Sequence, residues 1–137
     1  RRAIGIDVRA AKLEAAARYA AKSGVKAEFY QSDGRSIPLP DATADLAFMR
    51  HVYHEIEDVG PVLRELTRAL KPGGRLAIME KTRGGLRPIG PPIVNISRIT
   101  DSMGEAALEA GGEIHMGNET IVIGKRSQGS GPVITTR

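Results

Sequence analysis

Short apolar runs and helix-spaced apolar residues alternate along this chain. The apolar runs predict strands at Ala3–Asp7, Ala27–Tyr30, Ala44–Met49, Arg75–Glu80, Glu113–Met116 and Thr120–Gly124. Apolar residues at helical spacing predict helices at Ala10–Ser23, between Asp58 and Leu70, and at Thr100–Ala110. This alternation predicts an α/β fold with a mainly parallel sheet and right-handed crossovers. The last two strands would add a terminal antiparallel hairpin.

Turn-forming residues mark where the predicted helices begin and end. Gly24 is expected to close the first helix in a left-handed conformation. We expect Asp58 to cap the second helix, with Pro61 in its first turn, and the segment Lys71–Gly74 to end it. The pair Gly111–Gly112 is expected to end the third helix.

The length of 137 residues predicts one domain, which we place at residues 1–125, followed by a flexible tail at 126–137. The Gly/Pro-rich loop at 81–95 is long for a compact domain. Its part at 84–92 could form a lid over a site or a solvated connection.

Composition narrows the class of protein. The apolar share of 41% is that of a soluble globular chain, and no window of about 18 apolar residues predicts a membrane span. The absence of cysteine excludes disulfides, thiolate metal sites and cysteine nucleophiles, and favours a cytoplasmic location. The net charge of +4 is scattered and aromatic residues make up only 4%, so we expect no nucleic-acid partner.

Asp7 is the first candidate site residue. It ends a predicted strand and precedes a helix, a place where a carboxylate can accept hydrogen bonds from the ribose hydroxyls of a nucleoside. The alternative is that Asp7 caps the helix that follows. The pair Asp33–Gly34 also follows a strand, although by itself a Ser-Asp-Gly sequence is typical of an ordinary turn.

A third candidate cluster, Arg50–Glu55, follows the strand that ends at Met49. His54 is a better general base near neutral pH than Glu55, because imidazole ordinarily ionises in that range. The alternative is that His54 only packs against or caps the next helix.

Metal and dinucleotide sites are weaker alternatives for these residues. His51 and His54 lie near acidic residues, but the order differs from HExxH and His115 is distant, so we predict no metal site. The glycine pairs do not form the G-x-G-x-x-G pattern after a strand, which leaves dehydrogenase-like nucleotide binding with little support.

The run from Asp45 to Glu80 reads DLAFMRHVYHEIEDVGPVLRELTRALKPGGRLAIME. It resembles the second half of class I S-adenosylmethionine-dependent methyltransferases of the small-molecule type, type 11, which is similar to the ubiquinone and menaquinone biosynthesis enzymes. The resemblance implies a Rossmann-like fold with the strand order 3-2-1-4-5-7-6. The chain matches strands 2 to 7, while the first strand and its glycine-rich turn are not in the sequence.

The resemblance also implies roles for the candidate residues. Asp7 would bind the ribose of S-adenosylmethionine with Val8 beside the adenine, and Asp33 and Gly34 would read the adenine. Arg50 and His51 would lie along the cofactor, largely through their backbone, and His54 and Glu55 would be the catalytic residues facing the acceptor.

The sequence therefore predicts methyl transfer to a small-molecule acceptor. The lack of an Asn/Asp-Pro-Pro-Tyr string after Met49 argues against the enzymes that methylate amino groups of DNA bases or protein amides. Because the first strand is missing, we expect a truncated piece of a longer enzyme, or one completed by association, for instance in a homodimer that exchanges elements. The alternative is a non-catalytic binding or scaffold module of the same ancestry.

Overall fold

A computed structural model of the chain describes residues 2–84 and 90–128. The chain divides into two compact units, Arg1–Leu39 and Pro40–Arg137, and each is considered by itself. Most of the expected lid at 84–92 and of the expected tail at 126–137 lies outside the described residues. Among the helices described here, none is long and apolar enough to cross a membrane.

The first unit is a strand–helix–strand segment: β1 (Ala3–Asp7), α1 (Ala10–Lys22) and β2 (Ala27–Gln31). The two strands pair in parallel, with Asp7 opposite Gln31. Gly24 follows the helix at a φ of 69°, which confirms its predicted left-handed conformation. Because the strands are parallel, the residues that follow Asp7 and Gln31 leave the sheet at the same end, where both strands have their carboxyl ends.

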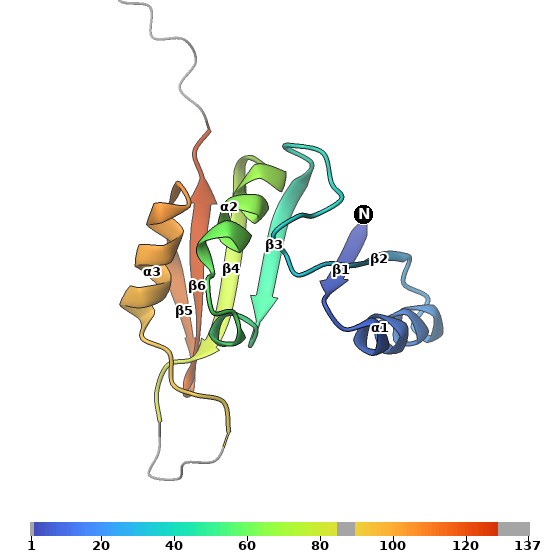
Figure 1. The fold of residues 1–137 in the computed structure, drawn as a ribbon. Helices are drawn as coiled ribbons and strands as arrows, with labels where there is room; N and C mark the ends of the chain where they lie inside the picture. The colour runs from blue at the N-terminus through green and yellow to red at the C-terminus, as the bar shows by residue number, and fades with distance from the viewer. Residues whose placement is uncertain (1, 85–89, 129–137) are drawn as a thin grey trace, which may run out of the picture. The chain divides into compact units, whose positions relative to one another are not determined.

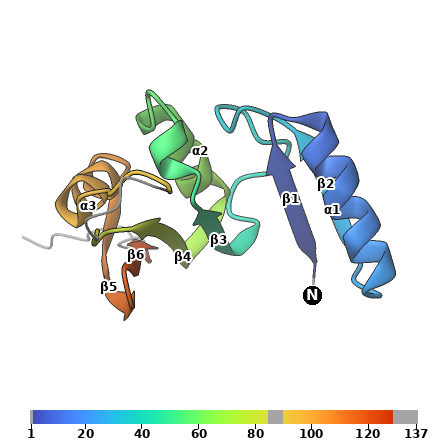
Figure 2. The ribbon, with the colours of Figure 1, turned by 90° about the horizontal axis from the view of Figure 1, so that it is seen from below.

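The second unit contains a four-stranded sheet with helices on one face (Figures 1 and 2). Its elements are β3 (Ala44–Arg50), the single 3-10 turn η1 (Tyr53–Glu55), α2 (Gly60–Ala69), β4 (Leu70–Lys81), α3 (Ile96–Glu105), β5 (Leu108–Met116) and β6 (Glu119–Arg126). Strands β3 and β4 are parallel, and β6 runs antiparallel between β4 and β5. Strands β5 and β6 are the predicted terminal hairpin.

The two sheets have the orders β1-β2 and β3-β4-β6-β5. If β1 is counted as the second strand of the methyltransferase fold, these orders correspond to 2-3 and 4-5-7-6. This arrangement confirms the predicted α/β fold class. The described residues place no strand beside the second edge of either β1 or β3, which are the strands that would flank strand 1 in the predicted order.

The third helix differs from the prediction. It spans Ile96–Glu105, because the Asn95 side chain accepts a hydrogen bond from the Ser97 backbone N–H at 3.0 Å and so caps an earlier start. Ala107, at a φ of 62°, turns the chain into β5. The pair Gly111–Gly112 therefore lies within a strand, at a β-bulge, and does not end a helix.

The ends of α2 are partly as predicted. Pro61 lies in the first turn, but the N-cap residue is Val59 and no side chain caps the helix, so the prediction for Asp58 was wrong. The helix ends at Ala69, immediately before the segment Lys71–Gly74, as expected. That segment already belongs to β4, because Leu70 pairs with Ala44 across a register shift.

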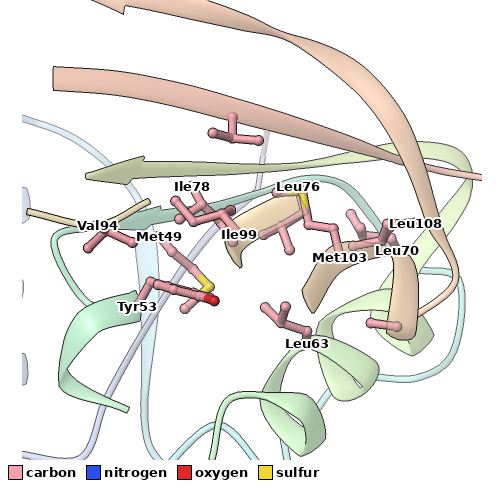
Figure 3. Packing of buried hydrophobic residues seen from close by; sticks show 12 residues of the cluster. Met49, Tyr53, Leu63, Leu70, Leu76, Ile78, Val94, Ile99, Met103 and Leu108 are labelled. Atoms are coloured by element: carbon pink, nitrogen blue, oxygen red, sulfur yellow. The ribbon is translucent and has the colours of Figure 1, made fainter. Parts of the chain in front are cut away.

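The core of the second unit lies between the sheet and the helices α2 and α3 (Figure 3). Tyr53, from the turn after β3, is 1% exposed and contributes the only phenol of this cluster. Its hydroxyl pairs with Ser102 Oγ at 2.7 Å and donates to the Arg98 carbonyl at 3.3 Å. The turn that carries His54 and Glu55 is thereby anchored to α3.

Replacing Tyr53 with Phe is expected to lower the free energy of unfolding by about 0.5–1.5 kcal/mol, because the buried hydroxyl and its hydrogen bonds are removed while the ring stays. The matched control is Tyr19→Phe, at a side chain that is 74% exposed. Thermal or urea unfolding of the three proteins would measure the difference. Equal losses in both variants would show that the Tyr53 hydroxyl does not anchor the turn.

Candidate functional site

Asp7 ends β1 with its side chain 29% exposed. Its Oδ1 accepts hydrogen bonds from the Arg9 backbone N–H at 2.8 Å and from Arg9 Nε at 3.3 Å. Arg9 is the N-cap residue of α1, and its own side chain makes no capping hydrogen bond. The Asp7 carboxylate accepts the backbone N–H of this residue and so lies at the start of the helix. Among the described residues none donates to Asp7 Oδ2, which leaves one oxygen available to a ligand.

The hydrogen bonds to Asp7 also set its charge state. Burial alone would raise the pKa of Asp7, but the bonds from the Arg9 backbone and guanidinium outweigh it, so the pKa lies below its usual value. The carboxylate is thus ionised throughout the neutral range. An ionised oxygen is a strong acceptor for hydroxyl donors.

Asp33 and Gly34 form a tight turn directly after β2. Asp33 Oδ1 accepts from the Arg35 backbone N–H at 2.9 Å, and Gly34 has a φ of 87°, a conformation that favours glycine. The Ser32 backbone N–H donates to the Asp7 carbonyl at 3.1 Å. This bond holds the start of the turn against the end of β1, so Asp7 and Asp33 lie at the same edge of the small sheet.

Val8 lies beside Asp7 with its side chain 59% exposed. Its carbonyl accepts a hydrogen bond from Gln31 Nε2 at 3.0 Å, which ties the residue after β1 to the end of β2. An exposed apolar side chain on a fixed backbone is a suitable surface for an aromatic base to lie against.

In the second unit Arg50 ends β3 and is exposed. His51 follows at a φ of 54°, which is unusual for a residue other than glycine and costs about 1–3 kcal/mol unless the surroundings hold it. Its backbone N–H donates to the Met79 carbonyl at 3.0 Å, and its ring Nε2 lies 2.7 Å from Glu119 Oε1. The chain therefore turns sharply where β3 leaves the sheet.

Glu80 is the carboxylate that positions His54. It is fully buried at the end of β4. Its Oε1 accepts the His54 backbone N–H at 3.2 Å, and its Oε2 lies 2.9 Å from His54 Nδ1. Since a carboxylate can only accept, the proton of a neutral His54 ring lies on Nδ1 and Nε2 carries the lone pair.

The other members of the predicted cluster contribute less to this arrangement. Glu55 is exposed, and its side chain bonds to none of the described residues. Sequence reasoning missed Glu80 and Glu119. The signal for Glu80 was present, because a charged residue follows Leu76 and Ile78 at the two-residue period of the buried face.

In the part of the chain that the structure describes, no group of three or more His, Asp or Glu side chains is arranged to hold a metal ion. His115 lies apart on β5 and pairs with Thr120 Oγ1 at 3.1 Å and Glu113 Oε2 at 3.1 Å.

The amino-acid sequence is similar to that of a known protein family. Residues 1–78 match a methyltransferase domain family, more than half of the chain. The chain belongs to the class I S-adenosylmethionine-dependent methyltransferases. S-adenosylmethionine is therefore the cofactor of its family.

Individual relatives agree with this assignment. The chain is 33% identical over 78 residues to the uncharacterized methyltransferase YcgJ of Bacillus subtilis, covering 56% of this chain and 31% of that protein. It is 32% identical over 77 residues to the demethylmenaquinone methyltransferase of Thermus thermophilus, covering 56% and 35%. The chain thus spans about a third of the length of these curated relatives.

A solved structure of a SAM-dependent methyltransferase from Aquifex aeolicus extends the similarity beyond residue 78. It has a TM-score of 0.80 at 29% identity and covers 89% of this chain and 67% of that one. The similarity of fold therefore includes the α3 and hairpin region, which the family match at residues 1–78 does not cover.

The lowered pKa of Asp7 predicts a pH-dependent contribution to stability. Because the folded pKa is below the unfolded value of about 4, the contribution is fully present above that value and is lost as the pH falls through the folded pKa. Asp7→Asn removes it. We expect wild type to melt at a higher temperature than Asp7→Asn at pH 6, with the gap closing below about pH 4. Circular dichroism would follow the melting of both proteins at each pH. A difference in melting temperature that stays constant down to about pH 2 would contradict this assignment.

Proposed function

We propose that the chain takes part in S-adenosylmethionine-dependent methyl transfer to a small-molecule acceptor. The observation that supports this most strongly is the convergence of Asp7 and Asp33 at one sheet edge through the Ser32–Asp7 hydrogen bond, in a chain of methyltransferase ancestry. Oδ2 of Asp7, which accepts no bond from the described residues, can accept hydrogen bonds from ribose hydroxyls. The exposed Val8 side chain can pack against the adenine ring, and the Asp33–Gly34 turn can hydrogen-bond to the polar edge of the adenine.

The second unit is considered by itself. The roles proposed there are that Arg50 and His51 would meet the cofactor through their backbone and that His54 would serve the acceptor. The cofactor, when bound, supplies a sulfonium methyl group for in-line attack, and much of the acceleration of such a step comes from alignment.

His54 is better placed as the general base than Glu55. Its Nδ1–H is held by the buried Glu80, so Nε2 can accept the proton that an acceptor hydroxyl, amine or carbon acid loses. Transfer of that proton leaves a positive charge on the imidazole beside a carboxylate, which stabilises it. Glu55 has no comparable partner in the described residues.

Part of the proposal is that the chain acts within a longer or associated protein. Strand β3 has no described partner on its outer edge, and its side chains Leu46 and Phe48 are 63% and 54% exposed. An unpaired strand edge with large exposed apolar side chains is costly in water. A further strand, from the same protein or from a second copy, would pair the open backbone edge of β3.

Calorimetry with S-adenosylhomocysteine tests the nucleoside site. We expect wild type to bind and Asp7→Ala to bind roughly tenfold to a hundredfold more weakly, because it loses charge-assisted hydrogen bonds. The matched control is Glu14→Ala, at an exposed position on α1 of the same unit. Equal affinities for wild type and Asp7→Ala would remove Asp7 from the site. No heat with wild type would favour a non-catalytic module.

Replacing His54 with Gln is expected to lower kcat by about 10²–10⁴ while KM for the cofactor stays nearly constant, because only the proton acceptor is lost. Transfer of a labelled methyl group to a panel of phenols, hydroquinones and amines provides the measurement. His115→Gln, on β5, is the control. A Glu55→Gln variant with the larger loss would show that Glu55, not His54, is the base.

A further inference from the structure

Glu119 brings the terminal hairpin into the site. It is the first residue of β6, and its carboxylate reaches His51 Nε2 at 2.7 Å, across from the end of β3. The side chain is 31% exposed, so the pair is partly shielded from water. This contact differs from the exposed carboxylate–imidazole pair of Glu113 and His115 on β5, whose side chains are 41% and 45% exposed.

The backbone around Glu119 is held firmly. Glu119 pairs with Lys81 in the β4–β6 ladder, and the carbonyl of the preceding Asn118 accepts the backbone N–H groups of Thr82 and Arg83 at 2.9 and 3.1 Å. The hydroxyls of Thr82 and Thr120 pair at 2.7 Å. The Glu119 carboxylate is therefore presented from a fixed position on the sheet.

His51 needs such a hold, because its left-handed backbone is strained. Its N–H bond to the Met79 carbonyl fixes one side of the residue, and the ring is fixed by Glu119. The other ring nitrogen, Nδ1, is a buried atom without a hydrogen bond and faces Glu80 Oε2 at 3.8 Å. Without Glu119 the ring would keep only the more distant Glu80 carboxylate as a charged partner among the described residues.

We propose that Glu119 is a positioning residue, which fixes the left-handed turn at Arg50–His51 by holding the His51 imidazole and so shapes the backbone that meets the cofactor. This inference rests on the proposed function of that turn. It assigns the terminal hairpin a role in cofactor binding besides completing the sheet.

The geometry also gives a spectroscopic signature. Glu119 Oε1 lies 2.7 Å from His51 Nε2, whereas Glu80 Oε2 lies 2.9 Å from His54 Nδ1. Because a carboxylate can only accept, we expect the proton of a neutral ring on Nε2 in His51 and on Nδ1 in His54. Nitrogen-15 spectra of the imidazoles in the 137-residue chain should show His51 protonated at Nε2. In Glu119→Ala that proton has lost its acceptor, and the His51 signals should change while those of His54 stay in place.

The experiment compares wild type with Glu119→Ala, Glu119→Gln and the control Glu113→Ala, using S-adenosylhomocysteine as the probe. We expect Glu119→Ala to weaken binding about tenfold, the range of one lost hydrogen bond to a charged group. Glu119→Gln should stay within about threefold, because its amide oxygen still accepts, and Glu113→Ala should bind like wild type. Wild-type affinity for Glu119→Ala, with unchanged His51 signals, would overturn the proposal.

A double-mutant cycle keeps the test informative if Glu119→Ala alone proves unstable. Glycine adopts a positive φ without strain, so in a His51→Gly background the substitution Glu119→Ala should add no further loss of binding. Losses that simply add would show that Glu119 acts by another route. Absence of binding by wild type would instead count against the proposed function, and the His51 signals would then still report whether Glu119 holds the ring.

Discussion

The buried carboxylate of Glu80 is the interaction on which the second unit's site depends. A carboxylate that is fully removed from water is tolerated only when its oxygens receive hydrogen bonds. Here both oxygens are used by His54, one by its backbone N–H and one by its ring. The apolar core around Tyr53 and α3 keeps water away, so the electrostatic hold on the imidazole is strong. The side chain of His54 is thereby fixed before any ligand binds.

In the first unit the candidate site residues are also held by hydrogen bonds, but without a buried core around them. Its helix contributes no buried residue, so the arrangement of Asp7 and Asp33 depends on backbone pairing and on short local hydrogen bonds. The bonds to Arg9 and Arg35 each use one carboxylate oxygen, and in the part of the chain that the structure describes the other oxygen accepts no bond. The candidate site residues Asp7 and Val8 are partly exposed.

The fold and half of the candidate site could be predicted from local patterns. Asp7 and the Asp33–Gly34 turn follow strands that apolar runs reveal, and parallel strands bring such residues to one edge. The strand period indicates that Glu80 is buried, but the histidine partners of Glu80 and Glu119 could not be assigned, because each pair joins distant parts of the chain. The third helix was misplaced because Asn95 caps it early and because glycine pairs occur at bulges as well as at helix ends.

Chemical-shift mapping of the isotope-labelled chain with S-adenosylhomocysteine tests the central claim most directly, namely the proposal that the strand-end residues described in each unit contact a methyltransferase cofactor. The account predicts that the largest amide shifts fall on the residues after β1, on the turn after β2 and on His51. Shifts confined to other surfaces, such as β5 and α3, or no shifts at saturating ligand, would contradict it.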